Sequence, residues 1–216
     1  MINVLIADPY HLVRTSIAHR LDQECDIAIA GEAADGESAV GQCRVKRPNV
    51  MLMDIRMPGI GGLEATRRMH RSMPETKVLA LTTHTSDSLA RHILEAGAAG
   101  FLSKSSSYHE MLDAIRHVFH GRRYIGHNVA QRLALANMAG EASRFDRLSL
   151  RELQIALMIV NCQRVAEISE RLHLSSKTVH TYRYRLFEKL NVSTDVELTH
   201  LALRHGLVDG FEATPP

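Results

Sequence analysis

The feature that most constrains the fold is an alternation of short apolar runs with longer helix-like segments over the first 120 residues. The runs cover residues 4–7, 27–31, 50–53, 78–81 and 99–102, and helix-like segments follow them at 12–21, 36–47, 63–72, 86–96 and 108–120. Continuously apolar strands are typical of parallel sheets, because helices bury both faces of such sheets. The pattern therefore predicts an α/β domain with a five-stranded, doubly wound parallel sheet.

The pattern changes after residue 121. Residues 122–146 hold one modest amphipathic segment, 129–138, and then small and polar residues, which predicts a linker with a short helix that is most flexible at 139–144. From residue 147 the apolar spacing is helical throughout, and Ser149 and Glu152 in "SLRE" predict a capping box at a helix start. The sequence thus predicts a domain over 1–121, a linker over 122–146 and a small all-α domain over 147–216.

Composition narrows the class of protein. The formal net charge of +2 over 216 residues is too small to indicate a nucleic-acid partner by itself. The three cysteines are widely spaced and form no C-x-x-C pair, so we expect neither a disulfide framework nor a zinc site. The start lacks a signal-peptide pattern, and no apolar run approaches the roughly 20 residues that span a bilayer. We expect a cytoplasmic protein without a membrane partner.

Reactive side chains follow four of the predicted strands, namely Asp8, Asp54, Thr82 and Lys104. The carboxyl ends of parallel strands meet at one edge of a sheet, and ligands bind there. An aspartate can accept a phosphoryl group covalently, while a lysine and a hydroxyl can stabilise the phosphoryl oxygens. Each residue taken singly is as readily a turn former, a surface charge or a strand cap. Their combination predicts phosphoryl transfer to Asp54.

The segment "SSKTVHTYRYRLFEKL", residues 175–190, has two faces when placed on a helix. Val179, Tyr182, Leu186 and Leu190 fall on one face, which predicts the core side. A basic, aromatic and hydroxylic outer face behind a helix and a short turn suits the DNA major groove, although an isolated helix of this kind is usually just solvated. The candidate DNA contacts are Lys177, His180, Thr181, Arg183, Tyr184, Arg185 and Lys189.

Several motifs carry a family resemblance. "LIAD", "LMDIRMPG", "ALT" and "GFLSK" resemble the receiver domain of two-component response regulators, and "LSLRE", "VAEISERLHLSSKTVHTYRYRLFEKL" and "ELTHLA" resemble the LuxR-type DNA-binding domain. Over nearly its full length the chain is similar to the NarL/FixJ family, and within it to the GacA/UvrY type. The resemblance implies a flavodoxin-like receiver followed by a helix-turn-helix domain, and a transcription regulator rather than an enzyme.

The resemblance also implies roles for individual residues. It makes Asp54 the phosphoacceptor with Lys104 and Thr82 as its partners, and it makes Phe101 the aromatic switch residue. It implies Mg²⁺ as cofactor, with Asp8, Asp54 and the Arg56 backbone carbonyl as ligands. The implied partners are a sensor histidine kinase, promoter DNA and a second copy in an active homodimer. The last helix, 195–205, is then the dimer surface, although from sequence alone it equally closes the core.

One position departs from the family pattern. Receivers of this family usually end the first strand with two adjacent acidic residues, whereas here Asp8 is followed by Pro9. Proline offers no side-chain ligand, and Mg²⁺ demands near-octahedral oxygen geometry. The departure predicts weak Mg²⁺ binding and slow phosphorylation. Proline also suits the first position of a helix, so Pro9 equally predicts the start of the first helix.

Three alternatives to phosphorylation-controlled DNA binding stay open at this stage. The chain could regulate transcription independently of phosphorylation. It could drain phosphoryl groups from a kinase, or it could sequester a related regulator in mixed dimers. The basic face around Lys177 and Arg185 argues against the last two alternatives, because neither role needs it.

Overall fold

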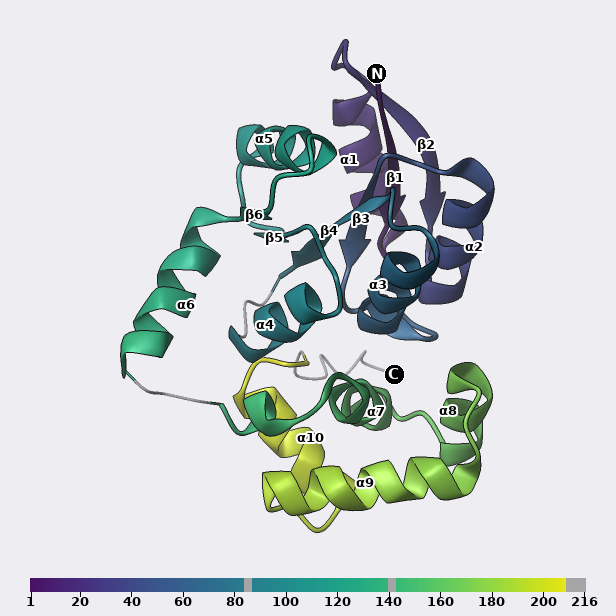
Figure 1. Cartoon of the computed structure of the whole chain (residues 1–216), viewed down its shortest axis with the longest axis vertical. Helices are drawn as coiled ribbons and strands as arrows, with labels where there is room; N and C mark the ends of the chain where they lie inside the picture. Colours follow the sequence, from purple (N-terminus) through teal and green to yellow (C-terminus); the bar gives the residue numbers. More distant parts are fainter. Residues whose placement is uncertain (84–86, 140–142, 209–216) are drawn as a thin grey trace, which may run out of the picture. The chain divides into compact units, whose positions relative to one another are not determined.

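The structure, a computed structural model, describes residues 1–83, 87–139 and 143–208, which form two compact units, Met1–Glu141 and Ala142–Pro216. The first unit contains a parallel sheet with strand order β2-β1-β3-β4-β5-β6 (Figure 1). The strands are β1 (Ile2–Ala7), β2 (Ile27–Ala33), β3 (Val50–Asp54), β4 (Lys77–Thr82), β5 (Gly100–Ser103) and β6 (Tyr124–Ile125). The predicted doubly wound α/β fold is confirmed.

Helices cover both faces of the sheet. The helices of the first unit are α1 (His11–Leu21), α2 (Gly36–Lys46), α3 (Gly61–Ser72), α4 (Asp87–Glu95), α5 (Tyr108–Phe119) and α6 (His127–Ala139). Successive residues of a strand point to opposite faces, so Val4 and Ile6 lie under α1 and α5, whereas Leu5 and Ala7 lie under α2 and α3. This two-sided burial explains why the strands are continuously apolar.

The sheet has one strand more than the five predicted. In β6 the Tyr124 N–H donates to the Ala99 carbonyl at 3.1 Å, and the Gly126 N–H donates to the Phe101 carbonyl at 2.9 Å. Backbone hydrogen bonds to β5 hold this two-residue strand in the sheet. A strand this short is too brief to show a run or an alternation of apolar residues in the sequence. The apolar runs therefore gave no sign of it.

Side chains of α2 cover the outer edge of β2, the strand at the other end of the sheet. The Lys46 ammonium donates to the Ala30 carbonyl at 2.7 Å, and the Gln42 amide donates to the Glu32 carbonyl. These two carbonyls face away from β1, the one neighbour of β2 in the sheet. Backbone groups that an edge strand usually leaves unpaired are thus occupied.

The region predicted as a linker contributes β6 and α6 to the first unit. Helix α6 packs against α4 and β5, with Val129 buried and the His127 N–H donating to Glu110 Oε1 at 3.1 Å. Of the segment predicted to be most flexible, residues 140–142 lie outside the described residues. Arg144 instead begins a 3-10 helix, η1 (Arg144–Arg147), which Ser143 caps and which the sequence pattern did not indicate.

The second unit is all-helical, as predicted. Its helices are α7 (Leu150–Val160), α8 (Val165–Leu172), α9 (Ser176–Leu190) and α10 (Asp195–Arg204). The predicted capping box is confirmed, because the Glu152 N–H donates to Ser149 Oγ and the Ser149 N–H donates to Glu152 Oε2.

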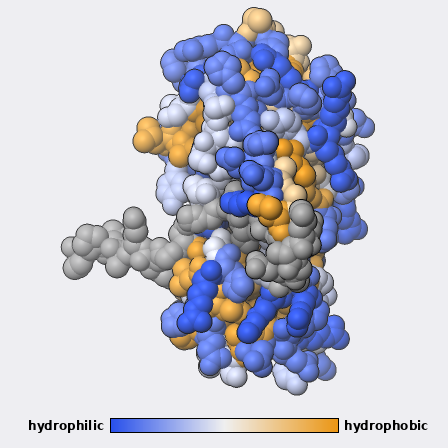
Figure 2. All heavy atoms as spheres, turned by 90° about the vertical axis from the view of Figure 1, so that its left-hand side faces the viewer, coloured by the Kyte–Doolittle hydropathy of each residue, from blue (hydrophilic) through white to orange (hydrophobic). Residues whose placement is uncertain are grey.

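Within the ranges described, no helix is long and apolar enough to cross a membrane. In the view of Figure 2, hydrophobic residues form small groups among mainly hydrophilic ones.

Candidate functional site

The carboxyl ends of β1 and β3 and the residue after β5 form a cluster that we name the acid pocket, consisting of Asp8, Asp54 and Lys104. Lys104 Nζ lies 2.5 Å from Asp8 Oδ2 and 2.9 Å from Asp54 Oδ2. The two aspartates are 1% and 3% exposed, so a single ammonium bridges two carboxylates that water hardly reaches. Sequence reasoning placed these three residues at one edge of the sheet, and the structure brings them into direct contact.

The loops after β1 and β3 fix the remaining carboxylate oxygens. Asp8 Oδ1 accepts from the Tyr10 N–H at 2.9 Å, and Asp54 Oδ1 accepts from the Arg56 N–H at 3.1 Å. Helix α3 begins directly against the end of β3, where a Cβ on Gly62 would lie 2.2 Å from the Asp54 carbonyl oxygen. Only glycine allows this close approach, so Gly62 helps to set the position of the Asp54 backbone.

Burial and charge act together in the acid pocket. Burial raises the pKa of the Asp54 carboxyl above its usual value, although the Lys104 ammonium opposes this shift. Burial alone would lower the pKa of Lys104, but its attraction to Asp54 and Asp8 outweighs burial and raises that pKa. The lysine is therefore a fixed cation. A charged Asp54 is costly to bury, and the Lys104 ammonium offsets part of that cost.

The other two predicted residues of this edge lie on β4 and β5. Thr82 ends β4 opposite Ser103 of β5, and the Thr82 carbonyl accepts from the Lys104 N–H at 2.7 Å. The Thr82 and Phe101 side chains are fully buried. Phe101 precedes Lys104 by three residues, so the strand that carries the predicted switch aromatic leads directly to the cation of the acid pocket.

Pro9 lies in the turn between β1 and α1. The prediction that it starts the helix is wrong, because α1 begins at His11 with Tyr10 as its N-cap. The turn is shaped instead by hydrogen bonds of Asp8 and by Arg14. Pro9 thus stands beside the acid pocket and adds no ligand to it.

The donors of the acid pocket fit Mg²⁺ with one acidic group fewer than the family pattern has. In the part of the chain that the structure describes, no group of three or more His, Cys, Asp or Glu side chains could hold a metal. Mg²⁺, however, usually keeps several waters and binds through one or two carboxylates together with phosphate oxygens. Asp8 and Asp54 supply two such carboxylates, and each of their oxygens has a lone pair left beyond its one protein hydrogen bond.

Arg14 of α1 was not among the residues predicted from the sequence. It is 9% exposed, and Nη1 donates to the Asp8 carbonyl at 2.7 Å and to the Pro9 carbonyl at 3.3 Å. Its Nε donates to Glu32 Oε2 at 3.0 Å. In the sequence it looks like one of several polar residues on a surface helix, so no pattern distinguished it.

In the second unit, α8 and α9 form the predicted helix-turn-helix. Val179, Leu186 and Leu190 are buried and Tyr182 is half-buried, which confirms the predicted phase of α9. The outer face carries exposed side chains, with Tyr184 72% exposed. These exposed residues are Lys177, His180, Thr181, Tyr184 and Arg185.

Two of the predicted DNA-contacting residues make contacts within the second unit. Arg183 Nε and Nη2 donate to the two carboxylate oxygens of Asp195 at 3.0 and 2.9 Å. Lys189 Nζ lies 2.6 Å from Glu152 Oε2 and so ties the end of α9 to the start of α7. These two cations hold helices together. Lys177, His180 and Tyr184 on the outer face are exposed, whereas the Thr181 hydroxyl donates to the Lys177 carbonyl at 2.9 Å.

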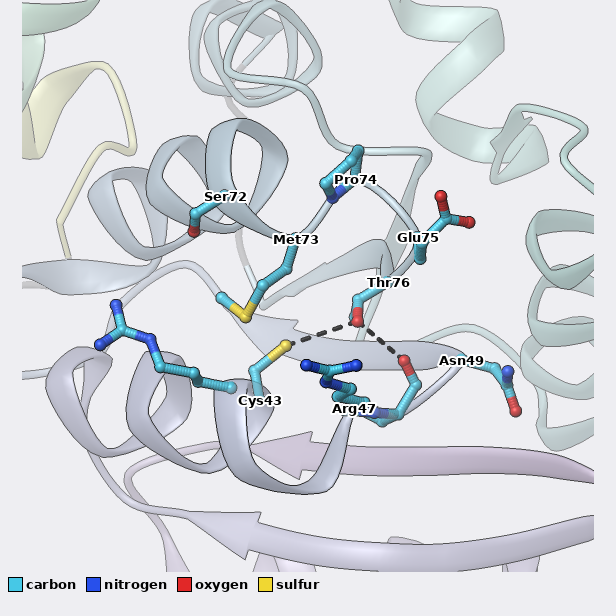
Figure 3. Close-up of a pocket in the computed structure, with 10 residues that line it drawn as sticks. Cys43, Arg47, Asn49, Ser72, Met73, Pro74, Glu75 and Thr76 are labelled. Carbon is cyan, nitrogen blue, oxygen red and sulfur yellow. Dashed lines mark hydrogen bonds between the residues drawn. The ribbon is translucent and has the colours of Figure 1, made fainter.

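A pocket of about 350 Å³ lies at the opposite edge of the sheet, near the starts of β3 and β4 (Figure 3). On its floor the Cys43 thiol donates to Thr76 Oγ1 at 3.5 Å, and the Thr76 hydroxyl donates to the Pro48 carbonyl at 2.8 Å. Burial raises the pKa of the Cys43 thiol, which makes it unreactive. Cys43 is therefore a packed side chain of this pocket, held by the Thr76 hydroxyl.

Comparison with family models assigns both units. Residues 4–116 match the response regulator receiver domain, and residues 146–202 match the bacterial regulatory proteins of the luxR family. The chain is a luxR-family response regulator. It is thus a DNA-binding transcription regulator of the two-component type, as the resemblance implied.

Named relatives of this response regulator cover nearly its whole length. It is 52% identical to response regulator GacA of Pseudomonas syringae pv. syringae over 97% of this chain and 99% of the relative. It is 53% identical to response regulator UvrY of Escherichia coli K12 over 96% of each chain. The structure of RcsB from Salmonella enterica serovar Typhimurium, bound to promoter rprA with phosphomimetic BeF₃⁻, shares its fold at a TM-score of 0.75 and 23% identity, covering 93% of this chain and 97% of that one.

Proposed function

We propose that Asp54 accepts a phosphoryl group from a sensor histidine kinase and that this modification controls the binding of promoter DNA by the C-terminal domain. One observation carries the proposal, namely the Lys104 ammonium 2.9 Å from the Asp54 carboxylate in a buried site. Phosphoryl transfer needs little beyond a positioned nucleophile and fixed positive charge, and this pair supplies both.

In the proposed step an Asp54 oxygen forms a bond to phosphorus while the phosphorus–nitrogen bond of the kinase phosphohistidine breaks. The electron pair of the broken bond stays on the histidine. Lys104 stabilises the charge on the phosphoryl oxygens, and the Thr82 hydroxyl donates a hydrogen bond to one of them. In this proposal the hydroxyl turns toward Asp54 when the phosphoryl group is present, which couples the state of Asp54 to β4.

Asp8, Asp54 and the Arg56 carbonyl are the groups that would hold Mg²⁺. When bound, Mg²⁺ would neutralise part of the negative charge of the phosphoryl oxygens. Because Pro9 replaces the second acidic residue after β1, we expect weaker Mg²⁺ binding and slower phosphorylation than a receiver with two acids has. The Lys104 ammonium then carries a larger share of the charge stabilisation.

The proposed signal travels along β5 to the linker. When Thr82 turns inward, Phe101 repacks, and the Phe101 carbonyl is hydrogen-bonded to the Gly126 N–H just before α6. A change in β5 is thereby transmitted through backbone bonds to the segment that precedes the DNA-binding domain. The two arrangements of Phe101 form a two-state equilibrium, which phosphorylation shifts.

The exposed start of α9 is the proposed DNA-reading surface. Lys177, His180 and Tyr184 can reach base edges in the major groove, with Thr181 and Arg185 beside them. Arg183 and Lys189 contact phosphates only if their intramolecular ion pairs open. Because one such domain makes few contacts, we propose that the active form is a homodimer that uses α10 and binds a palindromic site.

Pro9 favours one second candidate, a regulator that binds DNA independently of phosphorylation. The deciding experiment measures DNA binding by the full-length protein with a phosphodonor, without it, and for Asp54→Ala. Phosphorylation control predicts tighter binding only for the wild type with the donor. Equal affinity in all three conditions would establish the second candidate instead.

A further inference from the structure

We propose that Arg14 is a positioning residue of the acid pocket, which fixes Asp8 by clamping the turn between β1 and α1. The inference rests on the proposed function for its consequence, although its geometry stands by itself. The guanidinium joins three parts of the receiver, since it contacts the end of β1, the turn at Pro9 and Glu32 of β2.

The cost of burying Arg14 indicates a specific role. A guanidinium is seldom buried unless its N–H groups have hydrogen-bond acceptors. Here Nη1 donates to the Asp8 carbonyl and Nε donates to the Glu32 carboxylate, and the planar guanidinium fixes the directions of both bonds. The Glu32 carboxylate, with its side chain 35% exposed, balances the charge. Lysine carries the same charge but presents it at a single point, so it cannot hold Glu32 and the two carbonyls together.

Asp8 is held through three of its oxygen atoms. Its carbonyl accepts from Arg14, its Oδ1 from the Tyr10 N–H and its Oδ2 from Lys104. Arg14 and Tyr10 both act through the β1–α1 turn, the position where this chain has proline in place of an acidic residue. Asp8 is the one carboxylate at the end of β1, since proline follows it. A change in the orientation of the Asp8 carboxylate is therefore not compensated by a second acidic side chain at this strand end.

The test compares full-length Arg14→Ala and Arg14→Lys with Arg20→Ala. Arg20 is the matched control, because it lies exposed on the same helix and stacks on Tyr108, 3.9 Å from its ring centroid. Beryllofluoride with Mg²⁺ serves as the phosphoryl probe, and its binding is followed by calorimetry. The amide signal of Tyr10 in metal-free protein and the thermal unfolding midpoint are recorded for each variant.

We expect Arg14→Ala to weaken binding of the probe by about tenfold or more, as loss of a group that supports a ligand does. Arg14→Lys should recover little of this loss, and Arg20→Ala should bind as the wild type does. The Tyr10 amide should shift in both Arg14 variants. Probe affinity that falls only in proportion to the unfolding midpoint across all variants would show a merely structural role and overturn the proposal.

The two proposals fail in different ways. A wild-type protein that binds no beryllofluoride would remove phosphorylation control, while a shifted Tyr10 amide in metal-free Arg14→Ala would still support the clamp. An unchanged Tyr10 amide in that variant would overturn the clamp, even if the wild type binds the probe tightly. Full recovery by Arg14→Lys would also overturn it, because charge alone would then suffice.

Discussion

The acid pocket and the outer face of α9 place polar groups in opposite ways. In the acid pocket each carboxylate oxygen of the two aspartates has a protein partner, and both aspartates are almost inaccessible to water. On α9, by contrast, Lys177, His180 and Tyr184 are exposed to solvent. A reacting group needs low dielectric and fixed neighbours, because electrostatic stabilisation is strongest where water is excluded. A reading surface needs groups that remain free until the partner arrives.

The largest expected effect comes from removing the Lys104 ammonium from the acid pocket. Lys104→Ala should slow phosphorylation of Asp54 by about 100-fold, since it removes the fixed positive charge next to the nucleophile. The rate is measured with a small phosphodonor by intact-mass spectrometry. Lys46→Ala is the control, because Lys46 only covers the edge of β2. An unchanged rate in Lys104→Ala would contradict the proposed role of this pocket.

Adding an acidic side chain to the acid pocket should raise its affinity for Mg²⁺. Pro9→Asp restores the second acidic residue and should tighten Mg²⁺ binding by about tenfold, because it adds one carboxylate to the two present. Isothermal titration with Mg²⁺ measures the effect. Pro9→Ala removes the proline without adding a ligand, so equal affinities for the two variants would show that Pro9 does not limit the site.

On the reading surface, Lys177→Ala should weaken DNA binding by about 1 kcal/mol, roughly fivefold, and reduce the salt dependence of affinity. The unfolding midpoint should not change, because Lys177 is exposed. Affinity is measured by fluorescence anisotropy at several salt concentrations. Arg122→Ala, an exposed change in the receiver, is the control. An affinity equal to that of the wild type would place the DNA contact elsewhere.

An effect of similar size to that of Lys177→Ala, on stability instead of DNA binding, concerns the ion pair that supports α9. Burial alone would raise the pKa of Glu152, but the Lys189 ammonium and the Ser149 N–H together hold it below its usual value. Its stabilising contribution is therefore present above the unfolded pKa of about 4.3 and is lost as pH falls through the lower folded pKa.

Glu152→Gln should accordingly lower the free energy of unfolding of the C-terminal unit by about 1 kcal/mol at neutral pH, because Lys189 is partly exposed. The difference from wild type should shrink below about pH 4, where the wild-type carboxylate takes up its proton. Denaturant unfolding at several pH values measures it. Glu188→Gln, exposed on α9, is the control, and a pH-independent difference would rule out the carboxylate as the cause.

Sequence alone predicted the five main strands, the acid pocket and the phase of α9 because each has a local signature. A buried strand appears in the sequence as a run of apolar residues, and the acidic residue at its end stands out as a single carboxylate. A packed helix appears as apolar residues that recur at helical spacing. Val179 and Leu186 gave the inner face of α9 correctly for this reason. The same signatures predict that Asp8, Asp54 and Lys104 lie at one edge of the sheet.

What sequence could not predict depends on pairs of residues that are distant in the chain or on backbone alone. Arg14 meets Glu32 eighteen residues away, and Lys189 meets Glu152 thirty-seven residues away, so neither pairing has a sequence period. Strand β6 consists of backbone bonds from two residues. The predicted position of Pro9 at the helix start is wrong because a proline near a helix can stand at its first position or in the preceding turn. The hydrogen bond from the Tyr10 N–H to Asp8 favours the turn.

The covered rim of β2 constrains how copies of this receiver can assemble. A foreign strand that approached this side would find the Ala30 and Glu32 oxygens already taken by Lys46 and Gln42. At the far side the sheet ends in β6, a strand of two residues. Self-association by continuation of the sheet at β2, the route that leads toward fibres, is therefore disfavoured.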